Sequence, residues 1–443
     1  MSEFPWDITV IGGGLAGCEA TWQLASRGYR VRLVEMRPLV QTPAHATANL
    51  AEVVCSNSFG GEGGAAGILK AELEMGGSLI LECAHASRVP AGGALAVDRG
   101  RFSELVSVRV ESHPNVELAR EEATELPDGR AVIATGPLTS PALAGSLQAR
   151  LGQCLFFFDA VAPIVTQESI DPEKTYAGGR YGHDTDYLNC PMNKEEYLAF
   201  HATLVSAERV MSHGFEEAYF ESCMPVEVLA ARGVDTLRFG PMRPVGLPDP
   251  RTGREPYAAV QLRRDNREGT LYNLVGFQTG LKWGEQARIL RMIPGLENAE
   301  VARFGVTHRN IYVNAPVVLD GFLRLKESPH LFLAGQITGV EGYMESTAMG
   351  LAAGIYAAMT LSGSPLPPWP RETAIGSLLN YLRSAETDSG KTFQPMNANL
   401  GVFPPLSRKI KDKKQKARET HARAVMATQG FFREMGGQGL ALG

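Results

Sequence analysis

The sequence predicts an α/β fold whose parallel sheet is built from both ends of the chain and is interrupted by an inserted α/β domain. Three short apolar runs predict this fold, because each reads as a buried strand and each is followed by glycine. The runs begin at Asp7, Ala131 and Leu331 of the 443-residue chain. A strand, a glycine turn and a helix in succession form the unit from which such sheets are assembled. The first and third runs therefore belong to one fold, and the chain between them is expected to form a separate module.

The first run introduces the most informative motif. Asp7–Ile11 reads as a strand, Gly12–Gly17 reads Gly-Gly-Gly-Leu-Ala-Gly, Cys18–Gly28 has helical spacing, and Val31–Glu35 is a second strand that ends in an acid. This is the context in which Gly-x-Gly-x-x-Gly indicates a Rossmann-type dinucleotide site. Its glycines permit the turn, the approach of a pyrophosphate and helix–strand packing, while the helix N-terminus stabilises the phosphate charge. The expected cofactor contacts are Gly12, Gly13, Gly14, Leu15, Ala16 and Gly17, with the Glu35 carboxylate on ribose hydroxyls.

The third run indicates which dinucleotide is bound. Leu331–Gly335 reads as a strand, Gln336–Gly339 follows it, and Ser346–Met359 reads as a helix rich in small residues. Two-dinucleotide-fold flavoproteins use such a late unit to reach the ribityl chain and isoalloxazine of FAD, and NAD-only Rossmann domains do not need it. The middle run, Ala131–Pro137, resembles the Ala-Thr-Gly strand of the same flavoproteins. Their usual Gly-Asp is Gly-Gln here, and glutamine can still donate and accept hydrogen bonds. The predicted cofactor is FAD, with further contacts from Gly136, Gly335, Gln336, Gly339, Glu341 and Gly342.

These elements predict the domain organisation. Residues 1–150 form the first part of the FAD-binding domain, residues 151–304 an insertion domain, and residues 305–443 the second part with a basic helical segment at its C-terminus. Within the insertion, Tyr197–Met211 reads as a helix. Phe59–Gly67 is dense in glycine and is expected to be a loop that lies against a planar ring or changes shape with a ligand.

Composition predicts a soluble cytoplasmic enzyme. The chain is long enough for two or three domains, and its hydrophobic content is 44%. The first strand starts at Asp7, which leaves no room for a signal or transit peptide, and the late small-residue helix is too short to span a bilayer. Six cysteines without Cys-x-x-Cys spacing fit a reducing compartment. No metal site is expected, because no His-Glu-x-x-His or similar spacing occurs.

Positive charge is concentrated near the C-terminus. The formal net charge is −5, which by itself argues against nucleic-acid binding. Between Arg408 and Arg423, however, eight cations oppose only Asp412 and Glu419. Polyanion binding needs only local positive charge, so this run is a candidate RNA-binding segment. Its candidate contacts are Lys409, Lys411, Lys413, Lys414 and Lys416, and two smaller clusters are Arg263, Arg264 and Arg267, and Arg303, His308 and Arg309.

Two of the cysteines lie in unusual segments. Cys55 lies in Glu-Val-Val-Cys-Ser-Asn-Ser, and Cys223 lies in Phe-Glu-Ser-Cys-Met-Pro-Val-Glu. Both segments are polar and rich in turn formers, which favours partial exposure and a usable thiolate. Cys18 and Cys83 have the surroundings of small packing residues. Cys55 and Cys223 are therefore the candidate catalytic thiols.

Several long motifs resemble one known family. Over essentially the whole chain, the sequence resembles the folate- and FAD-dependent tRNA (uracil-5-)-methyltransferases, TrmFO, which are related to the GidA flavoproteins. The motifs that carry the resemblance are Gly12–Gly17, Cys55–Ser58, Cys223–Glu227, Arg238–Leu247, Gly276–Thr279, Ile293–Glu297, His308–Asn310 and Gly335–Tyr343.

The resemblance implies a reaction and its partners. It implies that 5,10-methylenetetrahydrofolate supplies a carbon, that NAD(P)H supplies electrons, and that tRNA receives a 5-methyl group on uridine 54 of its T-loop. The base must be flipped out to reach the flavin. A thiolate that adds to C6 makes C5 of uracil nucleophilic, and the resemblance implies Cys223 for this role. Cys55 would then be the second functional thiol, which removes the C5 proton; the sequence leaves the exchanged assignment open. It also leaves open the oligomeric state and the places where folate and NAD(P)H bind.

Three other functions compete with this one. A flavin disulfide reductase would place two thiols a few residues apart, whereas Cys55 and Cys223 are far apart and no second Gly-x-Gly-x-x-Gly follows. A GidA-like enzyme that modifies the tRNA wobble uridine would need a longer C-terminal helical domain than Pro365–Gly443 provides. A non-catalytic RNA-binding flavoprotein would leave the two polar cysteine segments unexplained.

Overall fold

A parallel sheet joins the three glycine-bearing runs, as the sequence predicts. The structure is a computed structural model that describes residues 5–42, 44–152, 154–180, 186–210, 224–305, 307–384, 393–408 and 410–437. Among these residues, six strands form one sheet in the order β16-β17-β7-β1-β2-β6, parallel except for the β16–β17 pair. Their bounds are β1 Ile8–Ile11, β2 Val31–Glu35, β6 Val116–Arg120, β7 Ala131–Ile133, β16 Arg324–Leu325 and β17 Ser328–Leu333.

The middle run lies between the other two. Val132 of β7 is paired with Val10 of β1 on one side and with Phe332 of β17 on the other. All three side chains are buried. The carboxyl ends of β1, β7 and β17 therefore meet at one edge of the sheet, where parallel α/β folds bind their ligands.

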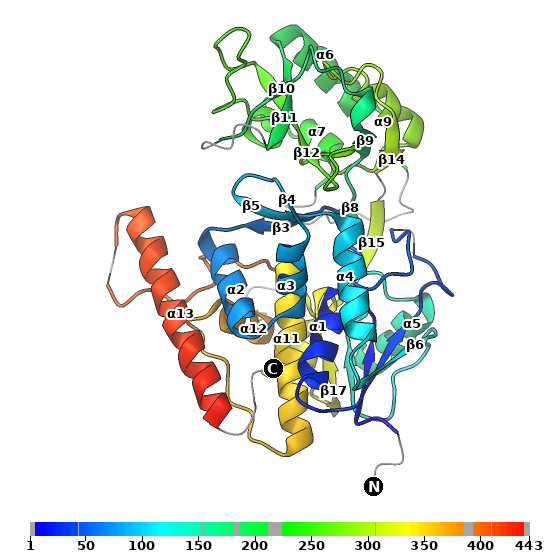
Figure 1. Ribbon diagram of the computed structural model, residues 1–443, viewed down its shortest axis with the longest axis vertical. Coiled ribbons are helices and arrows are strands. Elements are labelled where there is room, and N and C mark those ends of the chain that lie inside the picture. The colour runs from blue at the N-terminus through cyan, green and yellow to red at the C-terminus, as the bar shows by residue number, and fades with distance from the viewer. Residues whose placement is uncertain are drawn as a thin grey trace.

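Two helices from opposite ends of the chain pack closely beside this sheet. They are α1 (Leu15–Ala25) and α11 (Tyr343–Ser362), which lie side by side in Figure 1. A Cβ atom on Gly350 would lie 2.3 Å from the carbonyl oxygen of Ala16, so glycine is required for this approach. The helix α11 extends three residues beyond each end of the predicted Ser346–Met359.

A layer of helices and a small sheet cover the parallel sheet. The glycine-dense segment Phe59–Gly67, predicted to be a loop, instead forms strand β3 (Ser58–Gly61) and the first turn of helix α2 (Gly64–Met75). A Cβ atom on Gly67 would lie 2.2 Å from the carbonyl oxygen of Glu62, so the glycine serves the tight start of this helix. The elements are β3 Ser58–Gly61, β4 Arg88–Val89, β5 Ala94–Val97, α2 Gly64–Met75, α3 Leu79–Ala86, α4 Arg99–Glu111, α5 Pro141–Leu151, α10 Ala315–Val318, α12 Ala374–Ser384 and α13 Lys413–Gly437.

The insertion has a sheet and a hydrophobic core of its own. Strands β8 (Cys154–Ala160) and β15 (Thr307–Val313) pair antiparallel and connect it to the parallel sheet. The buried residues of its core run from Val165 to Ala299, and the domain bounds 151–304 stay a prediction. Its sheet has the order β10-β11-β12-β13-β9-β14. The elements are β9 Ile164–Thr166, β10 Tyr176–Ala177, β11 Tyr187–Met192, α6 Lys194–Ser206, α7 Val226–Ala231, α8 Thr236–Phe239, β12 Ala258–Arg264, β13 Leu271–Leu274, α9 Trp283–Leu290 and β14 Val301–Arg303.

Helix α6 begins and ends earlier than the predicted Tyr197–Met211. Asn193 and Glu196 form a capping box, in which each side chain accepts a hydrogen bond from the other residue's backbone N–H, and this fixes the start at Lys194.

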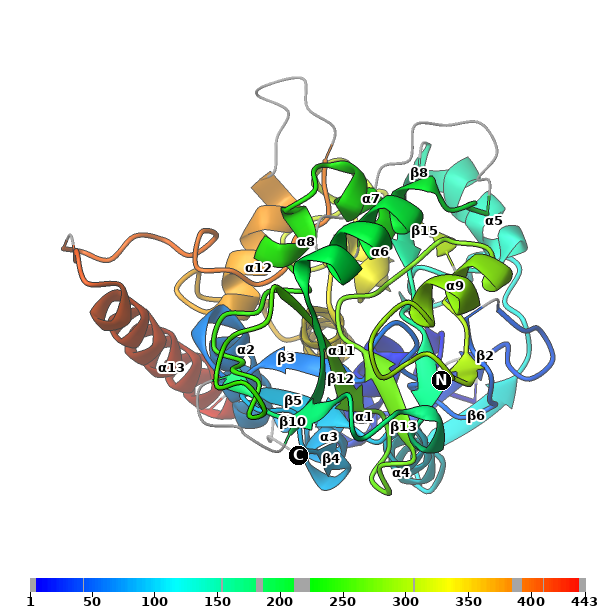
Figure 2. The same cartoon turned by 90° about the horizontal axis from the view of Figure 1, so that it is seen from above.

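Seen from above, the insertion covers the middle of the molecule, while α13 lies outside at the edge (Figure 2).

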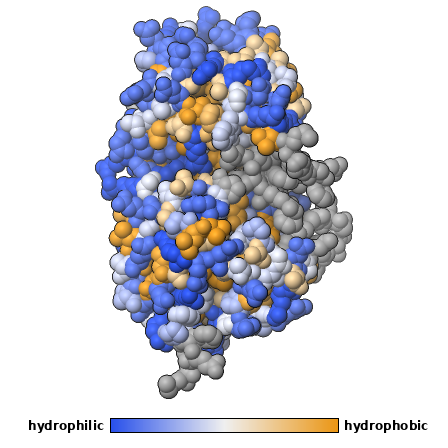
Figure 3. Space-filling view, turned by 90° about the vertical axis from the view of Figure 1, so that its right-hand side faces the viewer, coloured by the Kyte–Doolittle hydropathy of each residue, from blue (hydrophilic) through white to orange (hydrophobic). Residues whose placement is uncertain are grey.

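The helices that the structure describes are not of the membrane-spanning kind. Over the described part of the chain, no helix has both the length and the apolar character needed to cross a bilayer. The face in Figure 3 is largely hydrophilic, and its apolar side chains form small separate groups.

A buried carboxylate connects two helices of the parallel-sheet half and makes stability depend on pH. Glu72 on α2 accepts hydrogen bonds from the backbone N–H groups of Ala374 (2.6 Å) and Ile375 (2.9 Å) at the start of α12. Burial raises the pKa of Glu72 to about 8, although these two donors act to lower it. The folded protein thus holds this proton more tightly than the unfolded chain. The contribution of Glu72 to stability is therefore fully present at low pH and is lost as the pH rises from about 4.5 to about 8.

We expect Glu72→Gln to flatten this pH dependence, because glutamine does not ionise. One proton changes the slope of the unfolding free energy by at most about 1.4 kcal/mol per pH unit. Urea unfolding at about pH 5.5 and about pH 8 measures the slope. An identical fall in stability for both proteins between these two pH values would contradict the prediction.

Candidate functional site

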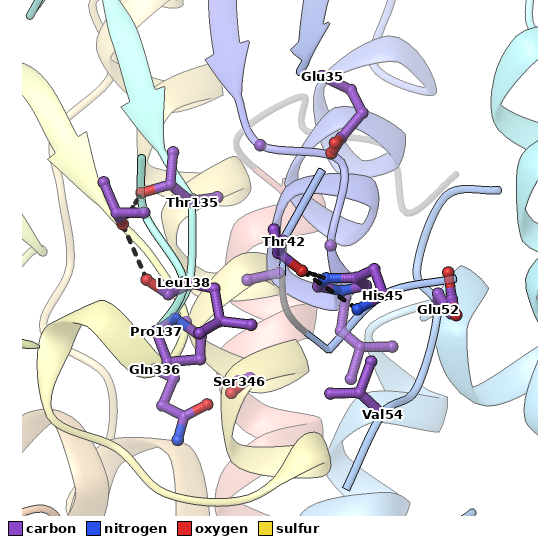
Figure 4. Close-up of a pocket in the computed structure, with 18 of the residues that line it drawn as sticks. Glu35, Thr42, His45, Glu52, Val54, Thr135, Pro137, Leu138, Gln336 and Ser346 are labelled. Atoms are coloured by element: carbon purple, nitrogen blue, oxygen red, sulfur yellow. Dashed lines mark hydrogen bonds between the residues drawn. The ribbon is translucent and has the colours of Figure 1, made fainter. Parts of the chain in front are cut away.

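One cavity collects the residues of all three predicted cofactor segments. It opens where β1, β7 and β17 end, and it is also lined by the loop that follows β2. In Figure 4, Thr135, Pro137 and Gln336 lie on one side, and Thr42 and His45 on the other. The predicted residues that line it are Gly12, Gly14, Leu15, Ala16, Glu35, Gly136, Gly335, Gln336, Glu341, Gly342 and Cys55. Gly13, Gly17 and Gly339 lie behind this lining.

The first glycine turn has the geometry that its spacing predicts. Gly12 has φ +102°, and a Cβ atom there would lie 2.6 Å from the carbonyl oxygen of Ala134. A Cβ atom on Gly17 would lie 1.7 Å from the carbonyl oxygen of Gly12. Gly14, by contrast, has nothing within 4 Å of its Cβ position although it borders the cavity. Gly12 and Gly17 are thus needed for packing, whereas Gly14 leaves room for a ligand.

Glu35 is held at the cavity by hydrogen bonds to both of its oxygens. Its Oε2 accepts the backbone N–H of Gly13 at 2.7 Å, and its Oε1 accepts the backbone N–H and the Nε–H of Arg37, both at 2.9 Å. Burial acts to raise the pKa of Glu35, but the Arg37 charge and these donors hold it below the usual value. The carboxylate is therefore ionised, and Oε2 keeps acceptor capacity for ribose hydroxyls.

The late segment turns sharply three times. Gly335, Gly339 and Gly342 all have positive φ, at +80°, +92° and +121°. A Cβ atom would collide with Ala16 at Gly335 and with Phe393 at Gly339. These turns place the backbone before α11 against the cavity. The Gln336 side chain, which stands where related flavoproteins have aspartate, donates a hydrogen bond to Glu341.

The segment around Cys55 is tied to the first residue of α11. The backbone N–H groups of Val54 and Cys55 each donate to the Tyr343 hydroxyl at 3.0 Å, and that of Ser56 donates at 3.3 Å. The Cys55 sulfur lies 3.0 Å from the same oxygen. Cys55 is half-buried and lines the cavity, as expected for a usable thiol.

Three arginines hold the same segment from both halves of the molecule. Arg99 of α4 donates to the carbonyl oxygens of Val53 (2.8 Å) and Val54 (3.0 Å), and Arg303 of β14 donates to that of Val54 at 2.6 Å. Arg263 of β12 donates to the side chains of Ser56 and Asn57, each at 3.0 Å. Asp265 pairs with Arg99 and offsets its charge, and the charges of Arg263 and Arg303 leave the segment in positive surroundings.

This contact revises one prediction from the charge pattern. Arg263, one of the candidate RNA-facing cations, is buried and serves the Cys55 segment instead. Arg303 also donates a hydrogen bond to this segment, at the carbonyl oxygen of Val54, while Arg267 is exposed. Sequence clusters of arginine do not distinguish a solvated face from an internal clamp.

The remaining cysteines behave as packing residues where they are described. Cys18, Cys83 and Cys190 are buried, and burial raises the pKa of each thiol, that of Cys83 to about 12. Cys223 lies outside the described residues, and its role stays a prediction.

The basic C-terminal run reaches the start of α13. Lys411, Lys414 and Lys416 are exposed; Lys409 and the side chain of Lys413 lie outside the description. Arg408 is paired with Glu419 at 2.6 Å, so part of the charge is neutralised internally. In Figure 1, the N-terminal end of α13, where this basic run enters the helix, is the end nearer the insertion. Their contact with RNA stays a prediction.

The donors around the cavity fit FAD. The open position beside Gly14 and the N-terminus of α1 suit a pyrophosphate, and the ionised Glu35 suits a ribose. The glycine turns before α11 allow a flat ring to lie against the backbone. Within the described chain, no group of three or more His, Cys, Asp or Glu side chains could hold a metal ion.

Fold and site together define a flavoprotein of the two-dinucleotide type with a thiol at its cofactor pocket. Residues 7–365 match the family model described as glucose inhibited division protein A. TrmFO of Moorella thermoacetica is 58% identical over 94% of this chain and 96% of its own length, and TrmFO of Geobacter sulfurreducens is 55% identical over 93% and 95%. The chain therefore belongs to the TrmFO family, the methylenetetrahydrofolate–tRNA-(uracil-5-)-methyltransferases, within the GidA family.

A solved structure shares the fold. Aquifex aeolicus GidA superimposes with a TM-score of 0.68 at 17% identity, covering 96% of this chain and 73% of that one. The fold class predicted from the sequence is confirmed.

Some residues of the site escaped the sequence argument. Tyr343 stood in a recognised motif, but nothing local showed that its hydroxyl meets Cys55, 288 residues away. Arg37 and His45, in the loop after β2, line the cavity although no sequence motif singled them out.

Proposed function

We propose that this protein transfers the methylene carbon of 5,10-methylenetetrahydrofolate to C5 of uridine 54 in the tRNA T-loop and reduces it to methyl with electrons from NAD(P)H. The observation that supports this most is Cys55, which lines the same cavity as the expected FAD contacts. A thiol beside a flavin brings covalent pyrimidine chemistry and hydride chemistry within one site. Membership of the TrmFO family supports the substrate pair. With no membrane-spanning helix among the described residues, the cytoplasm, where tRNA is modified, is the proposed location.

The proposed chemistry assigns a step to each thiol. The Cys223 thiolate adds to C6 of uracil, and the resulting enolate attacks the methylene carbon through C5. The Cys55 thiolate takes the C5 proton, and tetrahydrofolate leaves the methylene carbon with the electron pair of the broken C–N bond, so an exocyclic methylene remains on the ring. Reduced FAD, if held at this cavity, would supply the hydride that this carbon needs to become methyl, and the Cys223 thiolate would then leave C6. The arginines that hold residues 53–57 support this role, because they keep the segment of Cys55 at the lining of the cavity.

Mapping the product tests this proposal. Unmodified tRNA transcript, methylenetetrahydrofolate and NADPH are incubated with the protein, and the methylated nucleoside is located. We expect 5-methyluridine at position 54 and none in a transcript with cytidine there. Modification of the wobble uridine instead would favour the GidA-like alternative, whose fold this chain shares.

The basic run is the proposed tRNA contact. The five-fold Lys→Gln variant at 409, 411, 413, 414 and 416 should bind tRNA much more weakly, and its salt slope should fall by about one per lost phosphate contact. FAD content and NADPH reduction should not change, because the cofactor cavity is lined by other segments. Lys174→Gln with Lys194→Gln, on the insertion, is the matched control. Unaltered tRNA affinity of the five-fold variant at low salt would make the run a solvated face and direct attention to Arg264 and Arg267.

A further inference from the structure

The Tyr343 hydroxyl has more hydrogen-bond donors around it than a phenol oxygen can use. Three consecutive backbone N–H groups, those of Val54, Cys55 and Ser56, lie 3.0–3.3 Å from it, and the Cys55 sulfur lies at 3.0 Å. A phenol oxygen has one proton to donate and accepts about two hydrogen bonds. Its own proton points to the carbonyl oxygen of Ser56 at 3.1 Å. The Tyr343 oxygen, Oη, can therefore give up one of the hydrogen bonds that it accepts and can turn its own proton from Ser56 to the sulfur.

The direction of that proton depends on the state of Cys55. With a neutral thiol, S–H donates to Oη and the phenol donates to Ser56. With a thiolate, the sulfur only accepts, and the phenol proton can turn to it at 3.0 Å. Burial raises the pKa of Tyr343 well above its usual value, and the nearby Cys55 adds to this. The tyrosine therefore keeps a proton to offer.

The charges around the pair favour an anionic sulfur. The cations come from both halves of the molecule, and they outnumber the carboxylates that face the segment. Arg99 has an Nη2 atom that is buried and has no hydrogen-bond partner. The charged and titratable groups on the elements packed around Cys55 are Arg99 on α4, Arg263 on β12, Asp265 after β12, Arg303 on β14, Tyr343 on α11 and Glu52 on its own segment.

We propose that Tyr343 is a positioning residue for methylation, which fixes the Cys55 sulfur at the flavin cavity and donates a hydrogen bond to its thiolate. This rests on the proposed function, in which the thiolate accepts the C5 proton of the substrate. When that proton arrives, S–H donates back to Oη, and the phenol proton returns to the carbonyl oxygen of Ser56. No proton is gained or lost by Tyr343, so it is ready for the next turnover.

Alkylation of Cys55 by iodoacetamide tests the proposal without tRNA or folate. The thiolate displaces iodide and forms an S–C bond, and peptide mass spectrometry follows the Cys55 adduct across a range of pH. In Tyr343→Phe, the midpoint of the rate profile should move to higher pH by roughly one unit, because one hydrogen bond to the charged sulfur is lost. Tyr356→Phe is the matched control on the same helix, since its hydroxyl donates to the carbonyl oxygen of Pro367 instead. Its profile should match that of the native protein.

The outcomes separate positioning from a purely structural tie. If Tyr343→Phe changes the rate by the same factor at every pH, or leaves the profile unchanged, the proposal is overturned. Should Tyr343→Phe fold poorly, 3-fluorotyrosine at position 343 keeps the shape and strengthens the donor, and the midpoint should move to lower pH; an unmoved midpoint would also overturn it. Because the assay contains no substrate, a shift of the expected size in a protein without methylation activity would count against the proposed function alone, and the hydrogen bond from Tyr343 to the Cys55 thiolate would still stand.

Discussion

Cys55→Ala and Cys223→Ala are each expected to lose methylation while retaining a full complement of FAD. For Cys55, the loss of a proton acceptor should lower turnover by about 10²–10⁴-fold. For Cys223, no covalent activation of C5 remains, and methylation should be undetectable. Single-turnover methylation of tRNA, with flavin absorbance per protein as the second readout, measures both effects.

Matched controls are the cysteines that pack in the core. Cys18→Ala and Cys83→Ala should change stability alone, because both thiols are buried away from the cavity lining. If Cys55→Ala keeps near-native turnover, Cys55 is only a packing residue. The hydrogen bond from Tyr343 would then have no part in methylation.

Gly14→Val should fold and yet lose FAD. The backbone of Gly14 has φ −79° and ψ −170°, which any residue adopts, and its Cβ position has no neighbour within 4 Å. The valine side chain would fill the space beside the α1 N-terminus that the pyrophosphate needs. We expect bound flavin to fall by at least about tenfold, since the loss of even one hydrogen bond to a charged phosphate costs about 1.5–3 kcal/mol and a tenfold change needs only about 1.4 kcal/mol.

The control for Gly14→Val is Gly145→Ala in α5, where a Cβ atom also meets nothing and which lies outside the lining of the cofactor cavity. Gly17→Val is the opposite case, because its Cβ atom would overlap the carbonyl oxygen of Gly12 and the protein should not fold. A yellow Gly14→Val protein with native flavin content would show that the cofactor lies elsewhere.

The parts of the fold that could be predicted are those set by local chemistry. Gly12 and Gly17 follow from a turn whose close contacts admit no side chain, and β1, β7 and β17 are runs buried on both faces. The prediction of a loop for the glycine-dense segment Phe59–Gly67 was wrong. Glycine is also needed where backbones approach closely at the start of a helix, as at Gly67. The full length of α11 was missed, since its first turn carries polar groups that the cavity uses.

The contacts around Cys55 could not be predicted for a different reason. Tyr343 and Arg263 lie more than 200 residues away in sequence, and only the packing of α11 and β12 against the Cys55 segment brings them to it. In the sequence, the buried Arg263 and the exposed Lys414 both lie in clusters of positive charge, and nothing in these clusters distinguishes the two. Spacing in sequence reports on one helix or strand, whereas a clamp assembled from four elements leaves no periodic signal.

The central claim is that the methyl carbon comes from folate and is placed on uridine 54. The most direct measurement is the mass of that nucleoside after a reaction with methylenetetrahydrofolate that carries ¹³C in its methylene group. We predict 5-methyluridine with the heavy carbon at position 54, formed only when NAD(P)H is present. A methyl group of ordinary mass at that position, or the heavy carbon on the wobble uridine, would contradict the account.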